Sequence, residues 1–175
     1  MAENMNSNGG DDMSISIDPK EFRGILGHFP TGVTVVAGAA GGDAFGLAIG
    51  SFFSISLDPP LVGFCVGNES ESWKKVAATG AFSVNVLSEH QVEVSNTFAG
   101  KGEDKFAAIP WAASSDTGSP LITDAVAHLD CVLESTYAGG DHQIIVGRVR
   151  YLDLHRGDHE PLVFVKGGYS RHEKI

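Results

Sequence analysis

Hydrophobic and polar residues alternate along much of the chain in short runs that are typical of β-strands. Residues 33–37, 61–66 and 81–87 form three such runs, residues 127–137 and 143–154 form two longer ones, and residues 161–165 form the last. The glycine-rich sequence at residues 39–43 predicts a hairpin turn. Strands and helices do not alternate regularly, so the pattern favours an antiparallel barrel with peripheral helices over a doubly wound sheet.

Three segments have helical spacing instead. In the first, Asp18 is expected to cap the helix, with Pro19 at its first position and Glu21 completing a capping box. Its apolar stripe consists of Phe22, Ile25, Leu26 and Phe29, and Pro30 is expected to end it. The second is expected between residues 68 and 80, closed by a glycine, and the third from a capping box at residues 88–91 to about residue 98.

Residues 46–61, GLAIGSFFSISLDPPL, form the stretch around which the rest of the chain is organised. Small residues interrupt the large apolar ones, and the alternation shifts at Phe52 and Phe53, which predicts a strand, a kink and a second strand. Small side chains let a flat ligand or another backbone come close, and serine hydroxyls beside free backbone N–H groups can bind carbonyl or phosphate oxygens. A Gly/Ser-rich strand inside an ordinary barrel is the alternative that this pattern leaves open.

Length and composition narrow the class of protein. The chain has 175 residues, 42% of them hydrophobic, which suits one domain with a real core, and we expect residues 1–15 to be a disordered tail before a single domain at 16–175. The net charge of −10 argues against a nucleic-acid partner. No apolar run is long enough for a membrane span, and the N-terminal residues lack the pattern of a secretory signal. Cys65 and Cys131 lie in apolar runs, which favours two buried thiols in the cytoplasm over a disulfide.

The common nucleotide and hydrolase motifs are missing from the sequence: it has no G-x-G-x-x-G after a strand, no P-loop, no G-x-S-x-G and no H-E-x-x-H. His155 and His159 are four residues apart, but Gly157 and Asp158 between them indicate a turn, so a metal site there is weakly supported. His142 follows a tight connection between two strong strands, where a side chain is displayed at a rim. A loop histidine without a role remains an equal alternative on position alone.

Residues 98–106, FAGKGEDKF, place two lysines in a glycine-containing loop at a helix end. In so acidic a chain this loop is a candidate anion site, and a solvated charged loop is the alternative.

Taken together, these segments resemble the flavin reductase family with the FMN-binding split-barrel fold, the small components of two-component flavin-dependent monooxygenases. The resemblance covers about residues 22–169 and is carried by PTGVTVV at 30–36, SFFSISLDPPL at 51–61, FSVNVL at 82–87, FAGKGEDKF at 98–106, GSPL at 118–121 and GDH at 140–142. It implies a mainly β, antiparallel split barrel of Greek-key type. It also implies an NAD(P)H:flavin oxidoreductase that passes a hydride to the flavin N5 and supplies reduced flavin to a partner monooxygenase. The chain looks closest to reductases that serve aromatic or steroid-ring hydroxylases.

The resemblance also implies roles for particular residues. The flavin would be FMN, with FAD as the alternative, and the reductant NADH, with NADPH as the alternative. His142 would be the catalytic residue that orients the nicotinamide. The expected cofactor-binding residues are Thr31, Leu47, Ala48, Ile49, Gly50, Ser51, Ser54, Val66, Asn68, Ser72, Phe98, Ala99, Lys101 and Asp141. Ser51 and Ser54 would be donors to the ring, and Ser72 would lie at a helix start near the ribityl phosphate. A homodimer is expected, because sites in this family form at a subunit interface.

Two departures from the family pattern bear on affinity. Many relatives carry Thr or Asn where this chain has residues 48–50, AIG, so hydrogen bonds to the ring must come more from the backbone. Glu69 and Glu71 flank the expected phosphate site, where relatives often carry a basic residue, which is consistent with flavin as an exchangeable substrate. The rival functions are a pyridoxamine-phosphate oxidase-like enzyme, a non-catalytic flavin-binding or redox-sensing barrel, and a structural barrel without a cofactor.

Overall fold

A computed structural model describes residues 16–102 and 104–173, so the expectation of a disordered tail at residues 1–15 lies outside the described residues. The helices are α1 (Pro19–Leu26), α2 (Glu71–Ala78) and α3 (Val92–Ala99). The strands are β1 (Thr31–Gly32), β2 (Thr34–Ala40), β3 (Asp43–Ile49), β4 (Phe53–Leu57), β5 (Pro60–Gly67), β6 (Ala81–Val86), β7 (Trp111–Ala113), β8 (Pro120–Ile122), β9 (Ala127–Gly139), β10 (His142–Leu154), β11 (Leu162–Val165) and β12 (Gly168–Arg171).

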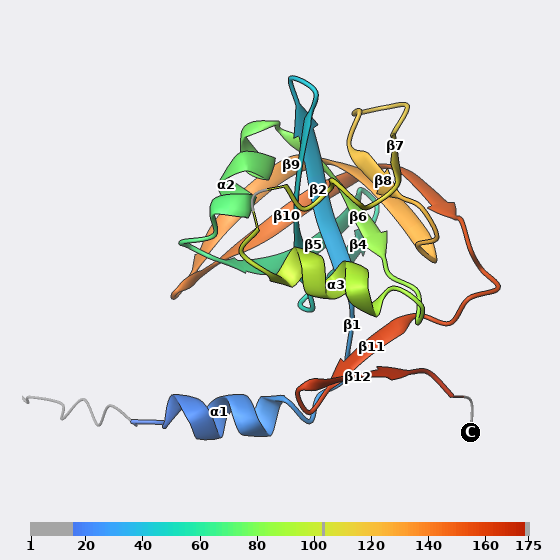
Figure 1. Ribbon diagram of the computed structural model, residues 1–175. Coiled ribbons are helices and arrows are strands. Elements are labelled where there is room, and N and C mark those ends of the chain that lie inside the picture. The colour runs from blue at the N-terminus through green and yellow to red at the C-terminus, as the bar shows by residue number, and fades with distance from the viewer. Residues whose placement is uncertain (1–15, 103, 174–175) are drawn as a thin grey trace, which may run out of the picture.

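Seven strands form one antiparallel sheet in the order β3-β2-β6-β9-β10-β5-β4, so the two edge strands are consecutive in the sequence. Laid flat, the edges of seven strands would be about 29 Å apart, because neighbouring strands are ~4.8 Å apart. The kink at residues 50–52 that joins β3 to β4 can span only about 14 Å. The sheet must therefore curl into an incompletely closed barrel (Figure 1). This confirms the expected mainly β, split-barrel fold, and the kink is the one expected within residues 46–61.

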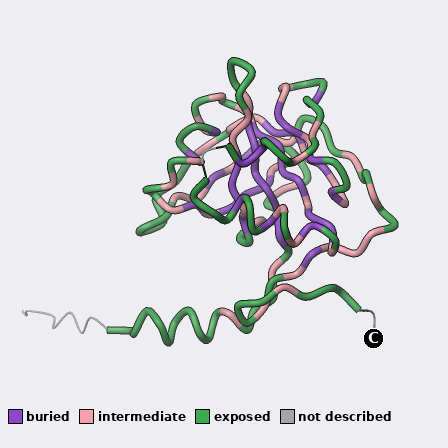
Figure 2. Tube along the Cα trace, in the orientation of Figure 1, coloured by how far each residue is buried: buried purple, intermediate pink, exposed green. Residues whose placement is uncertain are grey.

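The curled sheet is buried on both faces over much of its length. In β2, Val36 packs in a cluster with Phe64, Phe82 and Trp73, whereas its neighbour Val35 packs in a second cluster under α3. Edge-to-face contacts link the three aromatic rings of the first cluster. The ring centroids are 5.3 Å apart for Phe64–Trp73 and 5.5 Å apart for Phe64–Phe82. Figure 2 shows the buried residues gathered in the barrel strands. This packing makes the barrel a rigid frame for the loops at its ends.

Several expected elements differ in the structure. Helix α1 is capped by Asp18, whose side chain accepts from Lys20 N at 3.0 Å, but the helix ends at Leu26 rather than before Pro30. The third helix begins at Val92 rather than at Ser88, because residues 88–91 form a turn in which the Gln91 side chain accepts from Ser88 N. The turn at residues 41–42 uses two glycines at positive φ, as a two-residue hairpin requires.

Strand β1, near the start of the described chain, and strands β11 and β12, near its end, pair with one another outside the barrel. Strands β1, β11 and β12 form a three-stranded sheet below it, and α1 lies beside this sheet and points away from the barrel (Figure 1). Strand β12 is not predicted by the sequence pattern. The apolar stripe of α1 is exposed: the exposed fractions of Phe22, Ile25, Leu26 and Phe29 are 51, 64, 53 and 74%. Figure 2 shows α1 as exposed over its whole length.

Candidate active site

A groove with a volume of about 770 Å³ lies at the open edge of the barrel. It is lined by residues 47–51 of β3 and the kink, 65–67 at the end of β5, 69–72 at the start of α2, 98–101 at the end of α3, and by Lys105 and His142. Its size is in the range of small-molecule and cofactor sites. Six separate stretches of the chain therefore meet around one concave surface.

One wall of the groove is the small-residue stretch at the end of β3. The Ser51 hydroxyl donates to Cys65 O at 3.0 Å and accepts from Cys65 N at 2.9 Å, so it clamps the kink onto β5. A Cβ added at Gly50 would lie 3.1 Å from Thr31 Oγ1, which shows how closely the kink passes β1. This wall is thus a fixed edge of backbone with little side-chain bulk in front of it.

The opposite end of the groove carries a buried lysine. The Lys105 ammonium donates to Phe98 O at 2.9 Å, Ser72 Oγ at 3.4 Å and Gly46 O at 3.5 Å, all of them neutral oxygens. Lys105 is only 8% exposed, and this burial lowers the pKa of its side chain. Among the described residues, no carboxylate lies within salt-bridge distance of this ammonium. A buried cation with neutral partners at the end of a groove is suited to bind an anion.

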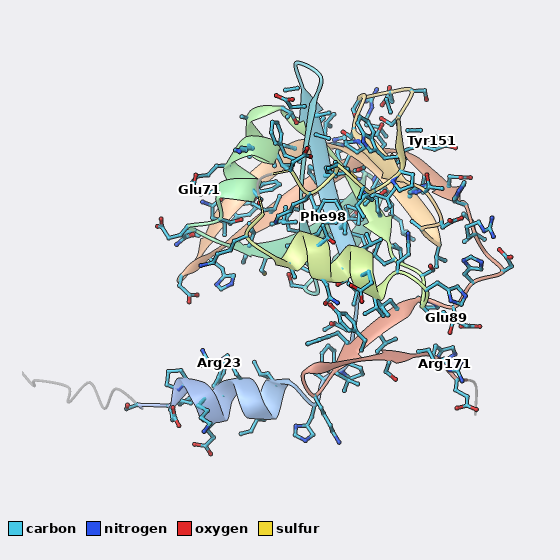
Figure 3. The ribbon with its side chains drawn as sticks, in the orientation of Figure 1. Arg23, Glu71, Glu89, Phe98, Tyr151 and Arg171 are labelled. Atoms are coloured by element: carbon cyan, nitrogen blue, oxygen red, sulfur yellow. The ribbon has the colours of Figure 1, made fainter. Side chains whose placement is uncertain are left out.

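The start of α2 adds to this anion-binding character. The Ser70 hydroxyl caps the helix by accepting from Trp73 N at 3.3 Å, and helix N–H groups favour a negative charge. Glu71, which is labelled in Figure 3, opposes an anion, but Lys74 donates to its carboxylate at 2.7 Å, and this hydrogen bond lowers the pKa of Glu71. The acidic pair expected to weaken a phosphate site is therefore partly neutralised.

His142 stands at the rim, where it is the first residue of β10 after the turn that leaves β9. Its Nδ1 lies 2.7 Å from Asp141 Oδ1, and this hydrogen bond lowers the pKa of Asp141. Because the carboxylate can only accept, Nδ1 carries the hydrogen and Nε2 is left for a ligand. Asn68, which follows β5, holds this turn: its backbone N–H donates to Asp141 O at 3.1 Å and its side chain to Gly140 O at 3.2 Å.

The structure brings most of the expected site residues together. Those that line the groove are Leu47, Ala48, Ile49, Gly50, Ser51, Val66, Ser72, Phe98, Ala99, Lys101 and His142. Thr31, Asn68 and Asp141 do not line it. Thr31 lies beside Gly50, Asp141 accepts from His142, and Asn68 holds the turn that carries Asp141. Ser54 does not line the groove: it lies beyond the kink, in β4, where it pairs with Val62.

The expected site residues leave out several contributors to the groove. Cys65 lines it from β5, and the helix cap Ser70 lines it from the start of α2. Lys105 is the most important omission, because it lies where the groove meets a second cavity of about 320 Å³ that extends past Phe45 and Lys75. Its signal was present in the two-lysine loop at residues 98–106, of which only the first lysine was assigned to the site.

The fold and the groove define a class, the split-barrel proteins that bind a flat, anionic nucleotide at the edge of the barrel. The chain belongs to the flavin reductase family: the model described as "Flavin reductase like domain" matches residues 26–173. This confirms the resemblance and the oxidoreductase class predicted from it.

Individual relatives agree with this assignment. The chain is 47% identical over 156 residues to a flavin reductase of Pseudomonas putida, covering 89% of this chain and 91% of the relative. It is 44% identical over 155 residues to the flavin-dependent monooxygenase reductase subunit HsaB of Rhodococcus jostii, covering 89% and 78%. The Streptomyces globisporus NADH:FAD oxidoreductase SgcE6, solved with NAD and FAD fragments, superposes with a TM-score of 0.84 at 37% identity, covering 90% and 96%.

Proposed function

We propose that this protein is an NAD(P)H:flavin oxidoreductase that binds FMN or FAD in the groove, reduces it and releases it to a partner monooxygenase. The observation that carries the proposal is the combination in one groove of a small-residue backbone edge, a buried ammonium and a rim histidine. The relatives support it, since HsaB is a reductase subunit of a flavin-dependent monooxygenase and SgcE6 is an NADH:FAD oxidoreductase. From the resemblance, the partner would be an aromatic or steroid-ring hydroxylase.

The residues of the groove fit a bound flavin. The ring supplies the hydride acceptor, and the protein supplies stacking, orientation and hydrogen bonds. The backbone of residues 48–50 would face the polar edge of the ring. Because the Ser51 hydroxyl hydrogen is already donated to Cys65 O, Ser51 would shape this edge more than it would donate to the ring. Lys105 and the start of α2 would hold the phosphate.

His142 would orient the nicotinamide at the open side of the groove. Its ring is fixed by Asp141 through Nδ1, so Nε2 would contact the incoming nucleotide. The hydride transfer itself moves no proton, so it requires no acid–base pair around His142. The role proposed for His142 is therefore positioning of the nicotinamide rather than proton transfer.

The second cavity bears on the choice of flavin. It shares Glu71, Ser72, Lys101 and Lys105 with the groove and therefore begins at the proposed phosphate position. The adenosine monophosphate portion of FAD would extend into it, so we expect FAD to be accepted as well as FMN.

We also propose that the protein is a homodimer built through α1. An isolated helix of eight residues is marginal in water, and α1 contributes no buried residue within the chain. The described part of the chain holds α1 at its end, where Lys166 N donates to Gly27 O at 2.7 Å. A second copy would cover the apolar stripe; light scattering should give a dimer, and Leu26→Glu should shift it towards the monomer.

The proposed location is the cytoplasm. Cys65 and Cys131 are both free thiols, as expected for a reducing compartment. None of the described helices is long and apolar enough to span a membrane.

Steady-state oxidation of NADH and of NADPH in air, with FMN, FAD or no flavin added, tests the enzymatic proposal. Oxidation that depends on added flavin would support a reductase with an exchangeable flavin, and the relative rates would identify the preferred pair. A tightly retained flavin with negligible nicotinamide oxidation would favour a flavin-binding or redox-sensing protein. No turnover with any of the four pairs would refute the reductase.

A further inference from the structure

Three potential metal ligands meet at the end of the barrel opposite His142. His128 lies at the start of β9, and the antiparallel register places Asp153, near the end of β10, directly opposite it. His155 follows β10, and its backbone N–H donates to Val126 O at 2.9 Å, which turns the chain back across the start of β9. One ligand atom from each of His128, Asp153 and His155 lies within 4.8 Å of the other two.

His128 is arranged as metal-binding histidines usually are. His128 is 4% exposed, and its Nε2 lies 2.8 Å from Ile122 O. Because a carbonyl oxygen can only accept, Nε2 must carry the hydrogen, which leaves the lone pair on Nδ1. A ligand histidine that donates its other ring N–H to a backbone carbonyl has its tautomer and ring orientation fixed in this way.

The other two side chains can adjust. Asp153 and His155 are 44 and 42% exposed, with Asp153 Oδ2 4.0 Å from His155 Nδ1. Tetrahedral coordination at the usual Zn–N and Zn–O lengths of ~2.1 Å requires ligand atoms about 3.4 Å apart. Rotation of the two exposed side chains towards His128 can supply this closure, which leaves the fourth position for water.

We propose that His128, Asp153 and His155 bind a divalent first-row transition metal such as Zn²⁺. Two imidazoles and one carboxylate suit zinc and its neighbours rather than Mg²⁺ or Ca²⁺, which prefer oxygen ligands. Asp153 and His142 lie near opposite ends of β10, about 35 Å apart along the strand at ~3.3 Å per residue. The metal is therefore separate from the flavin groove. It ties the segment that leaves β10 for the β11–β12 sheet to the barrel.

A zinc titration of the full chain without a histidine tag, in competition with a chromophoric chelator, tests this site. The expected result is one Zn²⁺ per chain at micromolar concentration, no competition by millimolar Mg²⁺, and at least tenfold weaker binding in His155→Ala and in Asp153→Asn. The matched control is His90→Ala, because His90 belongs to a neighbouring histidine pair, its ring 5.1 Å from that of His159. This variant should bind zinc like the unchanged protein.

Thermal unfolding gives a second readout that does not involve flavin. At free zinc of 100 times the Kd, the midpoint should rise by roughly 5–10 °C in the unchanged protein and much less in His155→Ala. Flavin-dependent NADH oxidation should be the same in both, which also shows that the variant folds. Absence of stoichiometric binding, equal binding in all variants, or loss of binding in His90→Ala alone would overturn the proposal.

Discussion

Replacement of Lys105 by methionine should weaken binding of phosphorylated flavins without damaging the fold. Methionine keeps most of the length of the unbranched side chain and removes the ammonium with its charge and its hydrogen bonds. The ammonium is buried and donates to neutral oxygens, and none of the described residues gives it an anionic partner. A bound phosphate would be the first. A hydrogen bond to a charged group contributes about 1.5–3 kcal/mol, which corresponds to a 10- to 150-fold rise in the flavin Kd.

The stability of the flavin-free protein should change little. Burial lowers the pKa of Lys105, which means that folding disfavours its charged form, and methionine relieves that cost. The lost hydrogen bond to Phe98 O works in the opposite direction. The two effects oppose each other, so the midpoint of thermal unfolding should stay within about 4 °C of the unchanged protein.

Riboflavin makes the assay specific, because it has the ring and the ribityl chain of FMN but no phosphate. The Kd of each flavin is measured by fluorescence titration for the unchanged protein and for Lys105→Met. The Kd of FMN should rise as calculated, and the Kd of riboflavin should not change. The control is Lys101→Met, an exposed lysine of the same loop that also lines the groove. Exposed charges contribute about 0–1 kcal/mol, so its effect should be under about sixfold and should vanish in high salt.

Two results would refute this reasoning. An equal loss of FMN and riboflavin affinity would mean that Lys105 shapes the groove instead of binding the phosphate. An unchanged FMN affinity would place the phosphate elsewhere. Either result would leave the flavin reductase activity itself standing, since that is tested by nicotinamide oxidation.

Four further predictions concern the rim, the core and the two thiols. His142→Ala should raise the nicotinamide KM about tenfold and leave the flavin Kd unchanged; unchanged steady-state kinetics would exclude the positioning role. Gly147→Ala should lower the free energy of unfolding by about 1–3 kcal/mol in denaturant titrations, because the added Cβ would overlap a buried phenylalanine ring of β6, whereas Gly32→Ala meets no neighbour and should be near neutral. Burial raises the pKa of Cys131 to about 12 from 9.0, so at pH 8 a thiol reagent should modify only Cys65, more slowly with FMN bound; equal rates would contradict this. Because the folded thiol titrates above the unfolded one, the stability contributed by Cys131 should be lost as the pH rises above 9.0, and Cys131→Ala should reduce that loss.

The strands of the barrel could be predicted from local pattern because the pattern and the packing agree there. The two glycines at residues 41–42 adopt the positive φ of a two-residue hairpin turn, and the alternating residues 81–87 contain strand β6 (Ala81–Val86). Strand β12 (Gly168–Arg171) could not be found in this way, because its short sequence GYSR has no apolar run and is a strand only through its pairing with β11. Helix α1 shows a different limit: the spacing of its apolar residues predicts the helix, but not whether the apolar face packs against its own chain.

The groove could be assembled from the sequence only through the family resemblance, because its lining comes from six separate stretches of the chain. Ser54 shows what a pattern cannot resolve. It continues the small-residue spacing of residues 46–56, but the kink at residues 50–52 starts a new strand, and the direction of each side chain depends on how that kink is closed. The clamp between Ser51 and Cys65 sets this closure, and it joins residues that are 14 apart.

Lys105 shows how a charge pattern can mislead and what would have corrected it. The loop at residues 98–106 contains four charged residues and two glycines, a composition typical of a solvated loop. However, it begins and ends with Phe98 and Phe106, whose rings pack edge to face with centroids 4.8 Å apart. Two buried aromatic residues at its ends require the loop to fold back onto the core, and the lysine next to the second one is drawn in with it. A lysine beside such an aromatic anchor is therefore a better candidate for a buried anion ligand than the lysine in the middle of the loop.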